Sequence, residues 1–155
     1  MIQVKVVRAL GAVVLMMGTA AVLAQTATPA EKAIEYRQAV FKVVAGNFGP
    51  LAQSAQGKLE LSPATARQYA ERLAQISQFA GDAFPEISRE GKTRAKPEVW
   101  TDRAAFDKLL QDLTDATRSL AGIAANAGAK PEDFKAAVGA VGNACKSCHD
   151  KYRET

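Results

Sequence analysis

Apolar residues recur at steps of three and four along four segments of the chain, which is the period of an α-helix. The first segment runs from about Glu31 to Phe48. Before it stands Thr28-Pro29-Ala30-Glu31, which supplies a helix N-cap, a first-turn proline and the glutamate of a capping box. We expect Gly49-Pro50 to end this helix, because proline has no amide hydrogen to donate.

The second and third segments have similar boundary signals. The second begins at Ser62-Pro63 and ends at Gly81, with its apolar positions at Ala66, Tyr69, Leu73, Ile76 and Ala80. The third follows Trp100-Thr101 and stops near Gly128. It is the most clearly amphipathic segment, and its apolar face consists of Phe106, Leu110, Leu113, Thr117 and Leu120.

The fourth segment begins at Pro131-Glu132-Asp133, where acidic residues favour a helix N-terminus, and continues to Tyr152. No segment alternates with a period of two, so no sheet is predicted. The sequence therefore predicts an all-α protein, an antiparallel four-helix bundle. The Pro-, Gly- and charge-rich residues from Gly81 to Trp100 are expected to cross the surface as a longer connection.

Residues 1–24 have the three parts of a secretory signal: cationic Lys5 and Arg8, an apolar run, and small residues before a cleavage site after Ala24. An uncleaved anchor is the alternative, but the apolar run is shorter than the roughly 20 residues that a spanning helix needs. We expect residues 25–155 to form one domain in the periplasm, with no membrane contact after cleavage. The mature chain keeps 18 basic and 16 acidic residues without a basic block, which argues against nucleic-acid binding.

Near the C-terminus lies Cys145-Lys146-Ser147-Cys148-His149, the CxxCH signature of c-type haem attachment. One helical turn presents two thiols to the vinyl groups on one edge of the porphyrin and the adjacent imidazole to the iron. The sequence therefore predicts one haem c, covalently bound through Cys145 and Cys148, with His149 as the axial iron ligand.

Other interpretations of the cysteine pair explain less. A zinc site needs about four ligands, and beyond these three side chains the mature chain offers only carboxylates. A thioredoxin-like dithiol is expected near a βαβ pattern, which is absent. A disulfide across so short a loop would stabilise little, and a structural pair leaves His149 unexplained.

The mature chain has no second strong iron ligand. All three methionines, Met1, Met16 and Met17, lie in the predicted signal peptide, and His149 is the only histidine. Electron-transfer cytochromes usually hold their iron between two strong ligands such as His and Met. The iron is therefore expected to be five-coordinate and open, unless a lysine or water coordinates it.

These features resemble cytochrome c′, a class II c-type cytochrome, over essentially all of the mature chain. The resemblance rests on three groups of residues: the CxxCH motif with Arg153 one turn later, Tyr36-Arg37-Gln38 followed by Phe41, and Pro97-Glu98-Val99-Trp100. Low-spin relatives carry a methionine ligand on the first helix, which this chain lacks, so it is similar to the high-spin branch. The family also implies a homodimer formed through the first two helices.

The resemblance implies a role for several side chains. It places Phe41 over the vacant haem face, Arg37 and Gln38 near the propionates, and Arg153 beside His149, as i,i+4 spacing independently suggests. From periodicity alone Phe41 is simply a core residue. Arg37 lies on the same apolar stripe, where an unpaired charge is costly, so a propionate partner is inferred.

Two further features have open interpretations. Trp100 either contacts the haem edge or covers the core. Three lysines either dock an acidic redox partner or form a solvated face: Lys135, Lys146 and Lys151.

The leading functional hypothesis is reversible binding of NO and CO at an open haem iron, with NO scavenging or storage as the role that the family implies. Phe41 supplies no hydrogen-bond donor, so O2 is disfavoured. The alternative is a low-potential electron-transfer cytochrome that serves an exported redox partner, and a third possibility is a non-haem exported helical protein. No enzyme is predicted, because the chain has no second histidine and no distal acid–base pair for peroxide chemistry.

Overall fold

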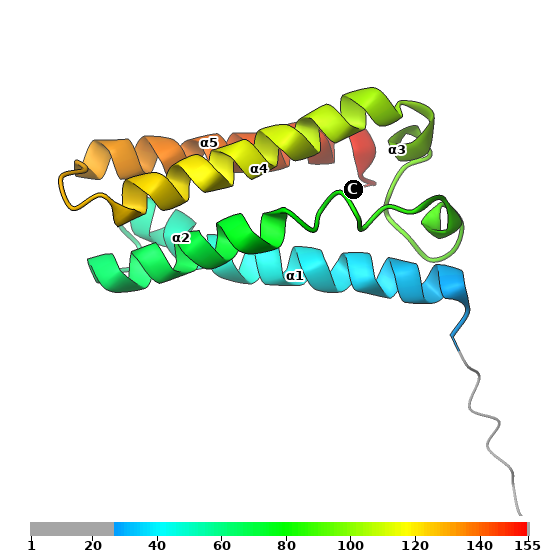
Figure 1. Ribbon diagram of the computed structural model, residues 1–155, viewed down its shortest axis with the longest axis horizontal. Helices are drawn as coiled ribbons and strands as arrows, with labels where there is room; N and C mark the ends of the chain where they lie inside the picture. Colours follow the sequence, from blue (N-terminus) through cyan, green and yellow to red (C-terminus); the bar gives the residue numbers. More distant parts are fainter. Residues whose placement is uncertain (1–26, 155) are drawn as a thin grey trace, which may run out of the picture.

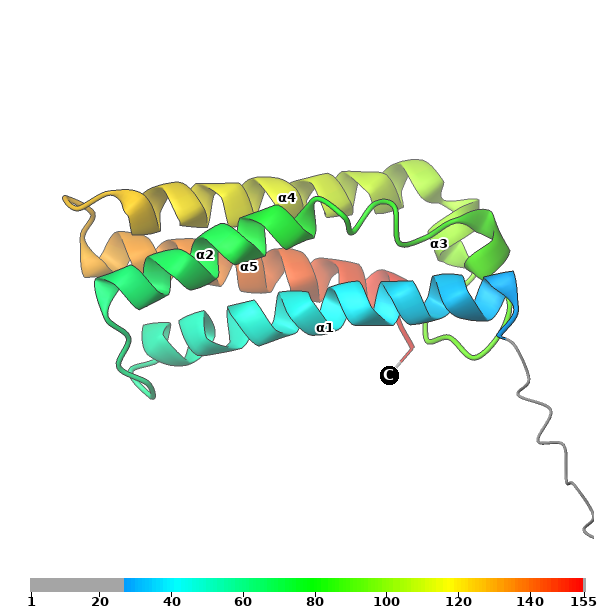
Figure 2. The same cartoon turned by 60° about the horizontal axis from the view of Figure 1, so that its bottom comes forward.

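Four long helices lie side by side in the computed structural model, which describes residues 27–154 (Figure 1). They are α1 (Pro29–Ala55), α2 (Pro63–Ser77), α4 (Arg103–Ala125) and α5 (Pro131–Tyr152). Each long helix runs opposite to the one before it, and α4 packs against both α2 and α5 (Figures 1 and 2). The predicted antiparallel four-helix bundle is confirmed.

The signal peptide predicted for residues 1–24 lies outside the described residues. Within residues 27–154, no helix is long and apolar enough to cross a membrane. The same range contains no strand, and its only extended pairing is the isolated antiparallel bridge between Ala95 and Arg153.

The helix starts follow the sequence signals. The Thr28 hydroxyl accepts a hydrogen bond from the amide of Glu31 at 3.2 Å, and the Glu31 carboxylate accepts one from the amide of Thr28 at 2.8 Å. At the start of α2, the Ser62 hydroxyl accepts from the amide of Thr65 at 3.2 Å. These side chains satisfy amide groups that the helix itself leaves without partners.

The expected end of the first helix at Gly49-Pro50 is wrong, since α1 continues through Pro50 to Ala55. Pro50 cannot donate a hydrogen bond to the carbonyl of Gly46, a loss that costs about 3 kcal/mol in a helix interior. The apolar stripe nevertheless continues beyond the proline. Leu51 is completely buried and Ala55 packs against the same core, so burial keeps this turn helical.

The expected end of the second helix at Gly81 is also wrong, because α2 ends at Ser77. The amide of Phe79 donates to the carbonyl of Ile76, and that of Ala80 to the carbonyl of Ser77, both at 3.1 Å. Ala80, which the helical period placed on the apolar face, is nevertheless buried in these tighter turns.

A first hydrophobic cluster lies between the four long helices, toward the end of α1 and the start of α5, and we call it the bundle cluster. Its buried members are Val44, Leu51, Ala70, Leu73, Leu113, Leu120, Ala137, Val138 and Val141. All five residues predicted for the apolar face of α4 are buried. Among them, the hydroxyl oxygen of Thr117 lies 2.8 Å from that of Ser77, so a buried hydrogen bond joins α4 to α2.

A second cluster lies toward the other end of the bundle, and we call it the aromatic cluster. Its buried members are Ala80, Ala83, Phe84, Val99, Phe106, Leu110 and Tyr152. The Phe106 ring meets those of Phe84 and Tyr152 edge-on, with centroids 4.7 and 5.1 Å away.

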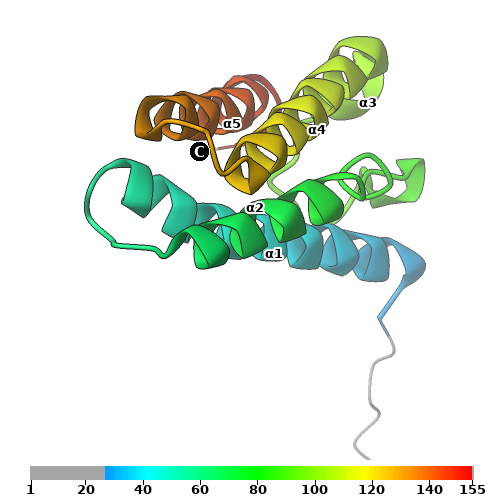
Figure 3. The same ribbon diagram turned by 60° about the vertical axis from the view of Figure 1, so that its left-hand side comes forward.

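The connection between α2 and α4 supplies part of the aromatic cluster, which corrects the expectation that it crosses the surface. It contains a short 3-10 helix, η1 (Glu86–Ser88), and a single turn, α3 (Glu98–Thr101), and several of its side chains are buried. Figure 3 shows the connection closing the end of the bundle where α3 lies. Gly91 has φ +119°, a backbone conformation that residues with a Cβ rarely adopt, so this turn of the connection favours glycine.

Candidate functional site

The CxxCH residues lie near the C-terminal end of α5, where the two clusters meet. Cys145 packs against the bundle cluster and Cys148 against the aromatic cluster. Both thiols are free and half-buried, and His149 is more exposed than either but still partly covered. Because the three residues are separated by three and four positions along a helix, they share one face of α5.

Burial controls the ionisation of these side chains. It raises the pKa of Cys145, and it raises the pKa of Cys148 to about 11, with a further contribution from the charge of Cys145. Burial and then the positive charge of Arg153 lower the pKa of His149. A lowered pKa favours the neutral imidazole, which is the form that binds a metal ion.

The turn that follows His149 is held by a segment distant in sequence. Tyr152 O accepts from the amide of Lys96 at 2.9 Å, and the amide of Glu154 donates to Arg94 O at 2.8 Å, on either side of the bridge to Arg153. The Arg94 guanidinium also donates to the carbonyl oxygen of Glu154 at 2.7 Å. Arg153 follows the last residue of α5 in an extended conformation, and its backbone is fixed by this pairing.

Asp102 fastens the same end of α5 from the junction of α3 and α4. Its carboxylate accepts from Lys151 Nζ at 2.6 Å and from the phenol of Tyr152 at 3.0 Å. These two hydrogen bonds lower the pKa of Asp102. Sequence analysis did not identify Asp102, because a local sequence pattern cannot predict a contact between residues about fifty positions apart.

Arg37 is buried, with only 5% of its surface exposed, in the position that the apolar stripe of α1 predicted. Its Nη atoms donate to the hydroxyls of Ser88 and Thr93, both at 2.7 Å. Burial lowers the pKa of Arg37, and none of the ion pairs within residues 27–154 includes it. The charge that sequence analysis expected to be paired therefore has neutral partners here. The next residue, Gln38, is exposed.

Phe41 and Trp100 are half-buried and pack against the aromatic cluster, as Cys148 does. The ring of Phe84 lies between them, with centroid distances of 5.9 Å to Phe41 and 6.5 Å to Trp100. The Nε1 atom of Trp100 is buried without a hydrogen-bond partner among the described residues. A buried donor of this kind is costly unless an acceptor completes it.

These observations test whether the residues suit a haem. A porphyrin offers a broad apolar face and two carboxylates. Cys148, Phe41 and Trp100 share an apolar cluster, and the uncompensated Arg37 charge and the unpaired Trp100 Nε1 both favour an added carboxylate. The side chains therefore fit the group that the CxxCH motif implies.

The competing zinc interpretation has no support in the described part of the chain, where no three His, Cys, Asp or Glu side chains gather as metal ligands. The three lysines that could dock an acidic redox partner do not form a single surface. Lys146 pairs with Asp150 and Lys151 with Asp102, and Lys135 lies toward the start of α5. Two of the three charges are thus compensated locally.

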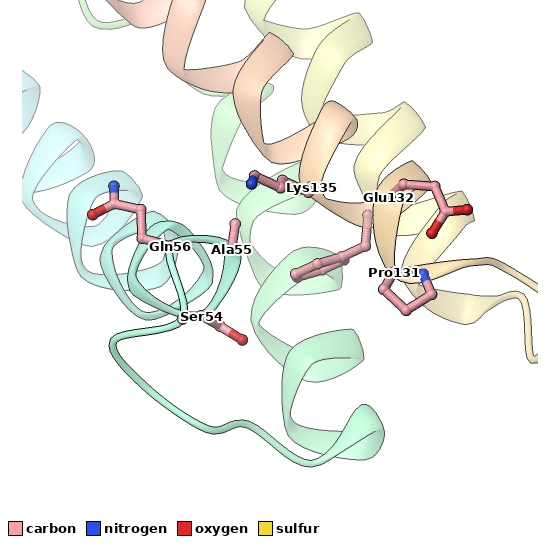
Figure 4. Close-up of a pocket in the computed structure, with 8 residues that line it drawn as sticks. Ser54, Ala55, Gln56, Pro131, Glu132 and Lys135 are labelled. Carbon is pink, nitrogen blue, oxygen red and sulfur yellow. The ribbon is translucent and has the colours of Figure 1, made fainter.

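A hollow at the opposite end of the bundle is a separate feature. Figure 4 shows it between the end of α1, around Ser54 to Gln56, and the first turn of α5, with Glu132 and Lys135 on its rim. Lys135 precedes Cys145 by ten residues, roughly 15 Å along a helix axis. None of the predicted site residues lines this hollow.

A helical bundle whose last helix carries CxxCH beside an aromatic cluster is typical of the four-helix class of c-type cytochromes. The family model described as Cytochrome C' matches residues 32–153. The chain therefore belongs to the cytochrome c′ family.

Known relatives agree with this assignment. Cytochrome c′ of Rubrivivax gelatinosus is 39% identical over 126 residues, covering 79% of this chain and 94% of that protein. Its crystal structure has a TM-score of 0.73 at 36% identity. Cytochrome c prime from Shewanella frigidimarina has a TM-score of 0.77 at 32% identity, covering 81% of this chain and 97% of that one. A nitric oxide complex of a cytochrome c prime mutant from Alcaligenes xylosoxidans also matches, with a TM-score of 0.73, 31% identity, and coverage of 81% and 97%.

Proposed function

We propose that this chain is an exported c-type haem protein whose iron binds NO and CO. The observation that carries the proposal is the placement of Cys145, Cys148 and His149 on one face of α5, in a chain with no other histidine and no methionine after residue 17. Cys145 and Cys148 would hold one haem c through thioether bonds, and His149 would ligate its iron. The bound haem would supply an iron position at which a diatomic ligand can bind.

Side chains around the aromatic cluster set the surroundings of that haem. The positive charge of Arg37 favours its carboxylates, and the Trp100 indole N–H provides a hydrogen-bond donor for them, with the exposed Gln38 as a further donor. Arg153 lies beside His149 on the proximal side. Each cationic or polar group therefore has a role at the edge or the proximal face, away from the open position.

Phe41 is the residue that we place over the open face. Its side chain is apolar and packs edge-on against Phe84, so it offers a bound ligand no hydrogen bond. Neutral NO and CO tolerate such surroundings, whereas bound O2 is polar and gains from a donor. This favours NO scavenging or storage over oxygen transport, and the nitric oxide complexes of solved relatives support it.

The setting of this function is also a proposal. We place the mature protein in the periplasm as a homodimer formed through α1 and α2, and the exposed apolar side chains of Tyr36 and Val43 on α1 are consistent with such an interface. We propose a binding role and no catalytic one, because the sole histidine is assigned to the iron.

Replacing Phe41 by alanine is expected to raise CO affinity by about tenfold, equivalent to roughly 1.4 kcal/mol, because it removes the bulk over the open face. CO titration of the reduced protein, followed optically, measures this. Phe48→Ala is the matched control, since Phe48 lies on the same stripe of α1 but packs against the bundle cluster. Equal CO affinity in wild-type and Phe41→Ala protein would exclude Phe41 from the ligand site.

A further inference from the structure

The buried guanidinium of Arg37 is held by a socket of neutral oxygens from the α2–α4 connection. Besides the two hydroxyls at 2.7 Å, the carbonyl oxygens of Ala83 and Ser88 accept from Nη1 and Nη2, each at 3.4 Å. The Arg37 Cζ atom also lies 4.9 Å from the ring centroid of Phe84 and 5.8 Å from that of Trp100. The guanidinium is thus held between hydroxyls and aromatic faces, with its charge uncancelled.

The two hydroxyls are themselves fixed by the loop. Ser88 is completely buried, and its hydroxyl donates to the carbonyl of Pro85 at 2.7 Å, which leaves its lone pairs to accept from Arg37. The hydroxyl oxygen of Thr93 accepts from the amide of Ala95 at 3.0 Å as well as from Arg37. Neither hydroxyl can rotate or move without losing a second hydrogen bond, so both hold Arg37 in one position.

A carboxylate in the same place would have a different effect. It would bind the guanidinium more strongly but cancel its charge, leaving little for another anion. Neutral oxygens satisfy the N–H groups and keep the full positive charge available. Because a cation stabilises the form of a nearby redox centre that carries less positive charge, an arginine held this way favours reduced haem.

We propose that Ser88 and Thr93 are positioning residues that hold Arg37 beside the haem as a cation without a carboxylate partner from the described chain, and thereby raise the reduction potential of the haem. This inference rests on the proposed haem function. Ser88 and Thr93 lie more than fifty residues before the CxxCH motif in the sequence, and neither residue belongs to a recognised motif of the chain.

The test is a double-mutant cycle on the reduction potential of the haem protein, measured by redox titration at pH 7 and low salt. Arg37→Gln is expected to lower the potential most. Ser88→Ala/Thr93→Val should lower it part of the way, while Thr93→Ser keeps the hydroxyl and stays near wild type. In the Arg37→Gln background the socket substitutions should cause no further fall. If Arg37→Gln does not accumulate folded, Arg37→Leu takes its place in the cycle, because it also removes the charge and an apolar side chain suits the buried position.

Thr117→Val is the matched control, because it also removes a buried threonine hydroxyl, one that bonds to Ser77 and not to Arg37. It should lower stability and leave the potential unchanged. The inference is overturned if the Ser88→Ala/Thr93→Val variant keeps the wild-type reduction potential. It is also overturned if these substitutions lower the potential as much in the Arg37→Gln background as in the wild type, or if Thr117→Val lowers it as much as they do. Purified protein without any covalent haem would instead refute the proposed function itself, a result visible in the absorption spectrum before any titration.

Discussion

Replacing both Cys145 and Cys148 by serine is expected to abolish covalent haem binding. The thioether bonds need sulfur, and a serine hydroxyl of nearly the same size cannot form them, so haem should be fully extractable with acidified organic solvent. The measurement is the haem absorbance that remains with the denatured polypeptide after extraction. Because both thiols lie on the boundary of the two clusters, the apolar packing changes little.

The control for this experiment lies inside the motif. Ser147→Ala alters the same turn of α5 at an exposed position and leaves both thiols and His149 in place, so it should retain covalent haem fully. Covalent haem on the double serine variant would show that the attachment site lies elsewhere.

Phe106→Ala is expected to cause the largest loss of stability, about 3–5 kcal/mol in the free energy of unfolding. Only 1% of the Phe106 surface is exposed, and its ring contacts Phe84 from the connection and Tyr152 from the end of α5. The substitution leaves a cavity at the point where these elements meet. Denaturant unfolding of the haem protein, followed by circular dichroism, measures the change.

Phe79→Ala removes the same ring at a site that is 49% exposed, and it should change the free energy of unfolding by no more than about 0.5 kcal/mol. Similar losses in the free energy of unfolding for Phe79→Ala and Phe106→Ala would show that packing in the aromatic cluster does not stabilise this end of the bundle.

Sequence reasoning predicted the parts of the fold that depend on local pattern. The capping box at Thr28 and the cap at Ser62 are visible within four residues of chain, and both form as expected. The five apolar positions of α4 are buried because a regular helix turns every third or fourth residue to the same side. The same periodicity placed Arg37 on the buried face of α1.

Features that depend on distant contacts escaped it. Pro50 is a helix breaker by local rules, yet the burial of Leu51 outweighs the lost hydrogen bond. The socket of Ser88 and Thr93 joins residues more than fifty positions from Arg37, and hydroxyl side chains in a polar loop carry no periodic signal. The contribution of the α2–α4 connection to the aromatic cluster was not predicted either. A Pro- and Gly-rich composition indicates irregular backbone, but it does not show which side chains are buried.

The roles of the site residues rest on chemistry that the polypeptide alone does not display. Cys145, Cys148 and His149 were found from a five-residue motif, and the bundle places them on one face of α5. Phe41, Trp100 and Cys148 all pack against the aromatic cluster, so the structure gathers around one cluster residues that the sequence separates by more than forty positions. Gln38 and Arg153 are near these residues but exposed, and their roles stay predictions.

An optical spectrum of the purified protein, oxidised, reduced and reduced with CO, tests the central claim most directly. The chain has no methionine after residue 17 and no second histidine, so a Soret band with high-spin features is expected in both oxidation states, and CO should shift the reduced spectrum. A low-spin reduced spectrum that CO leaves unchanged would contradict an open iron and favour an electron carrier, and the absence of a Soret band in protein made by cells competent for haem attachment would contradict the haem itself.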